Sequence, residues 1–212
     1  MLLLVTGASG VGKSTVRTLV EEELAPTVAS VELAYVLPLR AAPTLVWRQQ
    51  AAEEAVRRAI ELQPLGRHVL LSGDPVAAAE VVAAPSAPLL DGIAVCLLDA
   101  SPEAQTARLT ARGDDPSVLH HHHAFAEWMR RSASNPLHMP EVITTNGWDQ
   151  MRWDRLRHVS DTWHVTTIDT SDLSRRHVAE AVLAWARGSV AGDIPAIHVP
   201  QLEGPHSGEV LP

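Results

Sequence analysis

Phosphate chemistry is indicated by the residues from Gly7 to Ser14, which read GASGVGKS. Glycine, lysine and hydroxyl residues stand here at the spacing G-x-x-x-x-G-K-[ST] of a phosphate-binding loop. The glycines let backbone N–H groups approach an anion, Lys13 would supply a cation for the β- and γ-phosphates, and the Ser14 hydroxyl suits Mg²⁺. The sequence therefore predicts that the phosphates of a nucleotide contact Gly7, Ala8, Ser9, Gly10, Val11, Gly12, Lys13, Ser14 and Thr15.

Two carboxylates follow apolar runs and are candidates for work beside a phosphate. Glu32 ends an alternating run, and Asp74 comes after His68–Ser72, in the sequence Gly73-Asp74-Pro75. Asp74 could hold Mg²⁺ through water or share an acceptor site with Glu32. The alternatives are a surface glutamate at a strand end and an ordinary Asp-Pro turn.

Two arginines lie one turn apart on a predicted helix that Ser101 can cap and Pro102 can begin. Arg108 and Arg112 precede a Gly-Asp-Asp turn, and the planar guanidinium group can both stack on a base and bind phosphate. They could instead be solvent-facing helix charges.

The remaining pattern predicts the elements that would position these groups. Apolar or alternating runs predict five strands, at 2–5, 27–33, 68–72, 92–98 and 165–168. Helical spacing follows the phosphate loop and recurs at 49–62, 76–84, 101–111, 120–131, 148–158 and around Val178–Trp185, while 35–43 and 135–147 read as irregular. This alternation predicts an α/β fold with a doubly wound five-stranded parallel sheet, whose ligands bind beyond the carboxyl ends of the strands.

Residues 1–187 form one predicted domain, and the Pro/Gly-rich stretch 188–212 is expected to be an extended or disordered tail.

The composition limits the partners and the location that can be expected. The net charge of −8 argues against a general nucleic-acid or anionic-membrane surface. No segment reaches the length of a membrane span, and the chain is expected in the cytoplasm. The lone Cys96 lies in an apolar run and is expected to be a buried strand thiol.

The layout resembles the small P-loop kinases, such as shikimate and gluconate kinases, and is nearest in form to the chloramphenicol phosphotransferases. The resemblance covers roughly 1–113 and 163–187, and rests on GASGVGKST, the acid after the second strand, LLSGDP, LLDASPEAQTARLTARGDD and residues 168–171. It implies a three-layer fold, ATP and Mg²⁺ as cofactors, and metal contacts from Ser14 and Asp74. It also implies that Glu32 orients or deprotonates an acceptor hydroxyl, that Arg108 stacks on adenine, and that Arg112 reaches the phosphates.

The segment 116–162 departs from that resemblance where related kinases carry a lid. We expect it to close over the acceptor, with substrate contacts from His121, Phe125 and Trp128. Core packing is the alternative for Trp128, and polar helix positions are the alternative for the histidines. The run His120–His123 does not predict a metal site, because consecutive helical residues face different directions.

The expected activity is transfer of the γ-phosphate of ATP to a hydroxyl of a small molecule, such as a metabolite, a nucleoside-like compound or an antibiotic. The catalytic residues would be Lys13, Glu32, Asp74 and Arg112. One alternative is a nucleotide kinase, whose phosphorylated acceptor would need several basic residues near the second and third strands. Another is a nucleotide-operated ATPase or switch, for which the sequence shows no N-K-x-D motif. A monomer and a homodimer are both compatible with the sequence.

Overall fold

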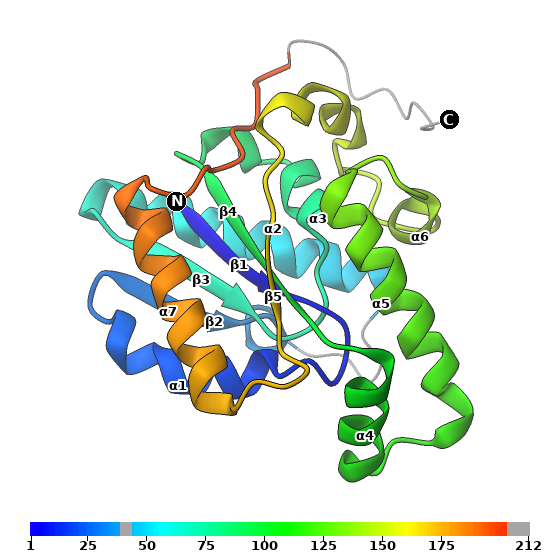
Figure 1. Cartoon of the computed structure of the whole chain (residues 1–212). Coiled ribbons are helices and arrows are strands. Elements are labelled where there is room, and N and C mark those ends of the chain that lie inside the picture. Colours follow the sequence, from blue (N-terminus) through cyan, green and yellow to red (C-terminus); the bar gives the residue numbers. More distant parts are fainter. Residues whose placement is uncertain (39–43, 203–212) are drawn as a thin grey trace.

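The computed structural model describes residues 1–38 and 44–202. Its centre is a parallel sheet with strand order β2-β3-β1-β4-β5 (Figure 1). The strands are β1 (Leu2–Thr6), β2 (Val28–Glu32), β3 (His68–Ser72), β4 (Ile93–Asp99) and β5 (Thr166–Asp169). β1 is buried along its whole length because side chains on both faces are covered: Leu2 and Leu4 belong to one core cluster, and Leu3 and Val5 to the other.

Helices cover both faces of this sheet. They are α1 (Lys13–Leu24), α2 (Leu45–Leu62), α3 (Ala78–Ala83), α4 (Pro102–Arg112), α5 (Leu119–Ser134), α6 (Glu141–Thr144) and α7 (Arg175–Ala191). α1 and α7 pack together on one face, and α2, α3 and α5 lie on the other (Figure 1). The predicted doubly wound, five-stranded, three-layer α/β fold is confirmed. Cys96 is buried, as expected.

Helices α2, α4 and α7 begin at side-chain caps. The Thr44 hydroxyl accepts a hydrogen bond from the Trp47 N–H at 3.1 Å, so α2 begins at Leu45, four residues before the predicted start. Ser101 caps α4 as predicted, and Ser174 caps α7. Part of the expected 35–43 loop, residues 39–43, lies outside the described residues.

The segment 116–162 is folded onto the core. The predicted helix at 148–158 is wrong for residues 148–152, and Trp153–His158 forms a 3₁₀ helix. Two further 3₁₀ turns of the segment are Pro116–Val118 and Ser160–Thr162. Buried Arg155 donates to the carbonyls of Ala84 and Pro85, and the Arg152 N–H donates to the carbonyl of Ala83, the last residue of α3. The predicted irregular stretch 135–147 contains the short α6.

The prediction of a tail that begins at 188 is wrong in its first part. α7 continues to Ala191, and Ile197 is 0% exposed and forms an antiparallel bridge with Ile93 at the start of β4. Ile197 occupies a core position, which the surrounding Pro/Gly-rich sequence does not indicate. Residues 203–212 lie outside the described residues. Within the described ranges, no helix is both long and apolar enough to cross a membrane.

Candidate functional site

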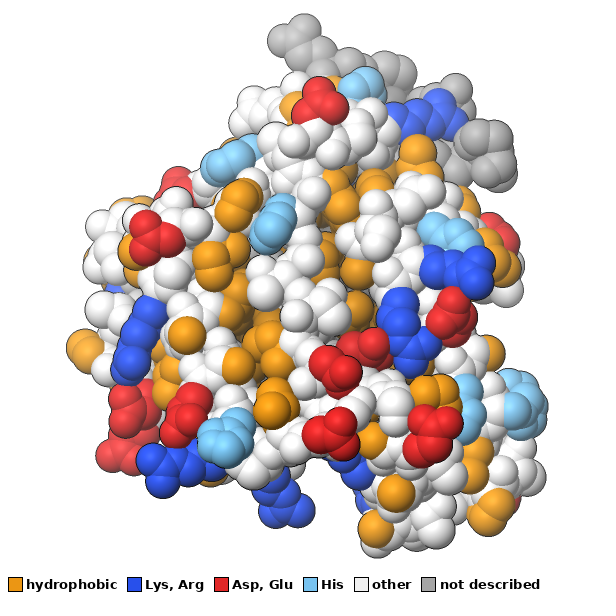
Figure 2. Space-filling model, in the orientation of Figure 1, with side chains coloured by type: hydrophobic (Ala, Val, Ile, Leu, Met, Phe, Trp, Pro, Cys, Tyr) orange, Lys and Arg blue, Asp and Glu red, His pale blue; other side chains and the backbone are white. Residues whose placement is uncertain are grey.

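The carboxyl ends of the five parallel strands meet at one edge, and a cavity of about 620 Å³ opens there. It is hollowed between the amino end of α7 and α4, at the lower edge of Figure 2, where blue Lys and Arg side chains lie beside it. Its lining combines residues from the loop after β1, the ends of β2 and β3, helix α4 and the start of α7. They are Ser9–Val16, Glu32, Gly73, Asp74, Pro75, Arg108, Arg112, Thr170, Leu173, Arg175 and Val178.

The phosphate loop connects β1 directly to α1, so the amino end of α1 faces the cavity. Gly7 allows the close passage of this loop beneath β4. A Cβ atom at Gly7 would lie 2.2 Å from the Leu98 carbonyl oxygen, and its φ of +144° is one that side chains rarely adopt. Ser9 to Thr15 line the cavity, whereas Gly7 and Ala8 belong to the loop but do not line it.

Lys13 is buried at the base of this loop. Its Nζ donates hydrogen bonds to the Gly7 carbonyl at 2.7 Å and the Ala8 carbonyl at 2.8 Å. Burial lowers the pKa of Lys13 to about 8, against the opposing effect of Asp74 and in the same direction as the positive charge of Arg112. The loop therefore holds an ammonium group that an anion would stabilise.

The two predicted carboxylates lie on the same cavity. Glu32 ends β2 and Asp74 follows β3, and the parallel pairing of these strands sets Glu32 opposite Ser72. An ion pair with Arg17 of α1, 3.0 Å between Nη2 and Oε2, holds Glu32. Both residues are half-buried, so each is packed against the protein on one side and accessible from the cavity on the other.

The two predicted arginines also line the cavity, but they are held differently. Arg108 donates to the Thr170 hydroxyl at 2.8 Å and to the Thr170 carbonyl, and is half-buried. Arg112 is exposed and makes a two-pronged ion pair with Asp114, whose hydrogen bonds raise the pKa of Arg112. Thr170 thus holds the Arg108 side chain at the side of the cavity. Arg112 is held by its ion pair with Asp114 at the surface, and it would have to break that pair to reach into the cavity.

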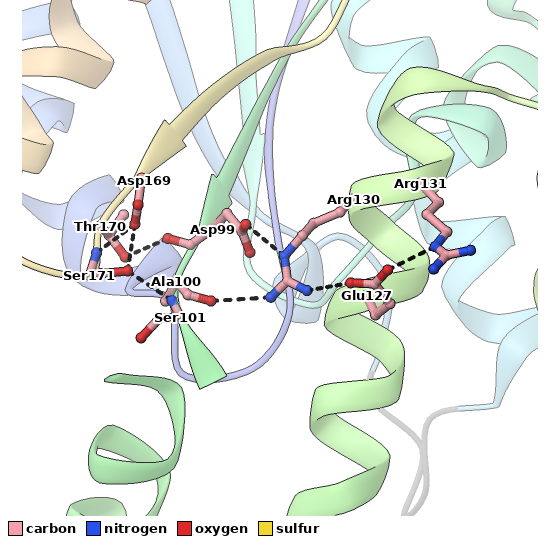
Figure 3. A network of polar contacts seen from close by, with 9 residues as sticks. All are labelled: Asp99, Ala100, Ser101, Glu127, Arg130, Arg131, Asp169, Thr170 and Ser171. Carbon is pink, nitrogen blue, oxygen red and sulfur yellow. Dashed lines mark hydrogen bonds and ion pairs between the residues drawn. The ribbon is translucent and has the colours of Figure 1, made fainter. Parts of the chain in front are cut away.

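Thr170, which holds Arg108, belongs to a polar network at the ends of β4 and β5 (Figure 3). The Thr170 N–H and hydroxyl both donate to the Asp99 carbonyl at 2.8 Å. The Asp99 carboxylate accepts from Arg130 of α5 at 2.8 Å, and Arg130 also pairs with Glu127. The network fixes α5 against the sheet on the side opposite α1.

The three residues expected to contact the acceptor do not lie on this cavity. Trp128 is 6% exposed, and its indole N–H donates to the carbonyls of His138 and Met139. Phe125 stacks on Trp128 with 5.4 Å between ring centroids, and His121 is exposed. Trp128 and Phe125 pack into the core, which is the alternative expected for Trp128, and contact of the three residues with an acceptor stays a prediction.

Oxygen ligands for a cation come from two elements. The exposed Ser14 hydroxyl and the half-buried Asp74 carboxylate line the same cavity, and both are donor types that Mg²⁺ accepts. Among the described residues, no group of three or more His, Cys, Asp and Glu side chains could hold a metal by itself. The donor set thus fits a magnesium ion that keeps most of its waters and is shared with phosphate oxygens.

Sequence reasoning missed Gly73, Thr170, Leu173 and Arg175 as parts of the lining. The stretch Ile168–Ser171 was a point of resemblance, but no spacing rule indicates that Thr170 would bridge β4 and Arg108. Leu173 lies in the turn before α7 and Arg175 is the first residue of α7, and only the strand order reveals that this end of α7 faces the phosphate loop.

Comparison with models of known families found no family that matches the chain. No curated protein was found to match its sequence.

Proposed function

We propose that this protein is an ATP-dependent phosphotransferase that moves the γ-phosphate to a hydroxyl of a small molecule. The observation that carries the proposal is that one cavity joins the phosphate loop with Lys13, the carboxylates Glu32 and Asp74, and the arginines Arg108 and Arg112. These are the groups that phosphoryl transfer needs for positioning and charge stabilisation.

The donor half of the proposed site is the loop and α4. Backbone N–H groups at the amino end of α1 and the ammonium group of Lys13 would hold the β- and γ-phosphates. Arg108, fixed by Thr170, presents a flat cation on which a purine base can stack. Arg112 would leave Asp114 for the charge that develops during transfer.

Ser14 and Asp74 would hold Mg²⁺ beside the phosphates. When bound, the ion would offset the negative charge of the phosphate oxygens. Asp74 would make this contact directly or through water, while the hydroxyl of Ser14 adds a neutral oxygen.

The acceptor half is the end of β2 and the turn after β3. Glu32 would accept a hydrogen bond from the acceptor hydroxyl and take its proton. The acceptor oxygen then forms a bond to the γ-phosphorus as the bond from that phosphorus to the β,γ-bridging oxygen breaks, which leaves ADP. A cytoplasmic location, where ATP is available, belongs to the same proposal.

The proposal is tested by a screen of hydroxylated metabolites, nucleosides and antibiotics with γ-labelled ATP and the wild-type chain. We expect label to appear on one class of alcohol, and Lys13→Ala to lose nearly all transfer while it keeps the fold. The surface variant Arg176→Ala is the matched control, since Arg176 pairs only with Glu180 on the outer face of α7. Release of labelled phosphate to water alone, unaffected by any acceptor, would instead favour a nucleotide-operated ATPase.

A further inference from the structure

We propose that Arg17 is the positioning residue that aims the Glu32 carboxylate at the acceptor oxygen. This inference rests on the proposed function and adds a residue that the motifs do not indicate. Arg17 does not line the cavity; it acts through Glu32, which does.

Arg17 lies one helical turn after Lys13 on α1, so the two side chains share a face of that helix. Its Nη2 donates to Oε2 of Glu32 at 3.0 Å, and its Nη1 donates to Oε2 of Glu21 at 3.0 Å. One helix thereby presents a cation to the phosphates through Lys13 and another to the carboxylate through Arg17.

This ion pair differs from ordinary surface pairs in its burial. The side chains of Arg17 and Glu32 are 18% and 21% exposed, whereas those of Arg187 and Glu23 are 59% and 61% exposed. Exposed pairs are mobile and contribute little, but a sheltered pair keeps its geometry. Among the described residues, no group donates a hydrogen bond to Glu32 Oε1, so this oxygen stays available to an acceptor.

Gly73 confines the same carboxylate from the other side. A Cβ atom on Gly73 would lie 2.9 Å from Glu32 Cγ, and the φ of Gly73 is +109°. A side chain at Gly73 would therefore collide with the Glu32 side chain where it now lies. Gly73 thus leaves room for Cγ of Glu32, and Arg17 holds the carboxylate group of the same side chain through Oε2.

The arrangement is not the one that stability alone favours. The Nε of Arg17 is buried and has no hydrogen-bond partner within the described part of the chain. A buried donor without a partner costs stability. The guanidinium plane instead serves Glu21 and Glu32 through its two terminal nitrogens.

The experiment measures release of labelled phosphate from Mg·ATP, with water as the acceptor, for wild type, Arg17→Met, Arg17→Lys, Glu32→Gln and the double variant Arg17→Met/Glu32→Gln. We expect Arg17→Met to lower kcat about tenfold or more, with the KM for ATP unchanged within about twofold. Arg17→Lys should recover part of the loss. The double variant should be no slower than Glu32→Gln, because Arg17 acts through that carboxylate.

Glu21→Gln is the matched control, since it removes the other ion pair of Arg17 and should leave kcat near that of wild type. If Arg17→Met fails to fold by circular dichroism, Arg17→Gln takes its place. A wild-type kcat in the Arg17 variants, a rise in the KM for ATP instead, or a further loss in the double variant would overturn the role of Arg17. A Glu32→Gln rate equal to wild type would likewise overturn it, because Arg17 acts through Glu32, whereas absence of Mg·ATP binding by wild type would overturn the proposed function itself.

Discussion

At the residue scale, the phosphate loop surrounds the buried amine of Lys13 with hydrogen-bond acceptors that carry no negative charge. Lys13 donates to the neutral carbonyls of Gly7 and Ala8, and no carboxylate touches its Nζ among the described contacts. A bound phosphate would supply the missing negative charge. The affinity for phosphate is therefore linked to the protonation of one amine.

This linkage gives a pH dependence with a definite sign. Because the pKa of Lys13 is lowered to about 8, the empty protein loses this proton as pH rises through that value. Phosphate binding favours the ammonium form, so the Mg·ATP affinity should fall by up to about tenfold per pH unit above pH 8. Isothermal titration at pH 8.5 in two buffers of different ionisation enthalpy should show proton uptake on binding. In Lys13→Met both effects should vanish; their persistence would contradict the assignment.

The two arginines of α4 should differ in which kinetic constant they control. Arg112→Ala should lower kcat by about 10²-fold with a small effect on the KM for ATP, because Arg112 meets charge that develops only during transfer. Arg108→Ala should raise the KM for ATP, since Thr170 already holds Arg108 as a wall for the base. Steady-state kinetics against ATP would separate the two, and equal, negligible effects would mean that both are solvated helix charges.

At the scale of elements, the loop after β1 depends on contact with β4. Gly7→Ala should cost about 3 kcal/mol or more and abolish nucleotide binding, because the added Cβ would meet the Leu98 carbonyl in addition to an unfavourable φ. Gly113→Ala is the control: its φ is +90°, but nothing lies within 4 Å of the new Cβ, so about 1–2 kcal/mol is expected. Urea unfolding would measure both, and equal losses would contradict the close-contact argument.

Helix α5 behaves as a fixed element in this structure. Trp128→Ala should cost about 3–5 kcal/mol of stability, because a buried ring and two carbonyl partners are lost. The exposed His121→Ala should be near neutral. Thermal unfolding together with Mg·ATP titration would test this, and a Trp128→Ala protein with unchanged stability but weaker acceptor binding would restore the expected substrate role.

At the scale of the molecule, the sequence was sufficient for the sheet and for half of the cavity. Residues 2–5, 69–71 and 93–98 are apolar throughout because both sheet faces are covered, and this pattern is visible in the sequence. Parallel strands bring their carboxyl ends together, so Glu32, Asp74 and the loop could be grouped in advance. Arg17 could not, because its partner is 15 residues away on a neighbouring element.

The segment after α4 was the least predictable part. Trp128 and Arg155 are residue types that serve either a ligand or the core, and only their partners decide. Here those partners are backbone carbonyls of residues outside the main helices and strands. A sequence does not show which carbonyls a buried indole or guanidinium group will contact, so the packing of this segment is not predictable from the pattern.

The chain end also contributes to the whole molecule. Ile197 is fully buried against the start of β4, so Ile197→Ala should destabilise the protein by about 2–5 kcal/mol. Because this contact lies at the amino ends of the strands, Mg·ATP affinity should not change. Chemical unfolding and titration would check both, and an unchanged midpoint would show that residues after α7 are dispensable.

Lys13 is the sole lysine of the sequence, and every other basic side chain except histidine is arginine. Apart from the amino terminus, the amine chemistry of this chain is therefore confined to the one nitrogen beneath the phosphate loop. An amine-selective acylating reagent used above pH 8, followed by peptide mass spectrometry, would report on a single internal position. Protection of that position by Mg·ATP would measure site occupancy without any knowledge of the acceptor, and the outer surface would remain unmodified.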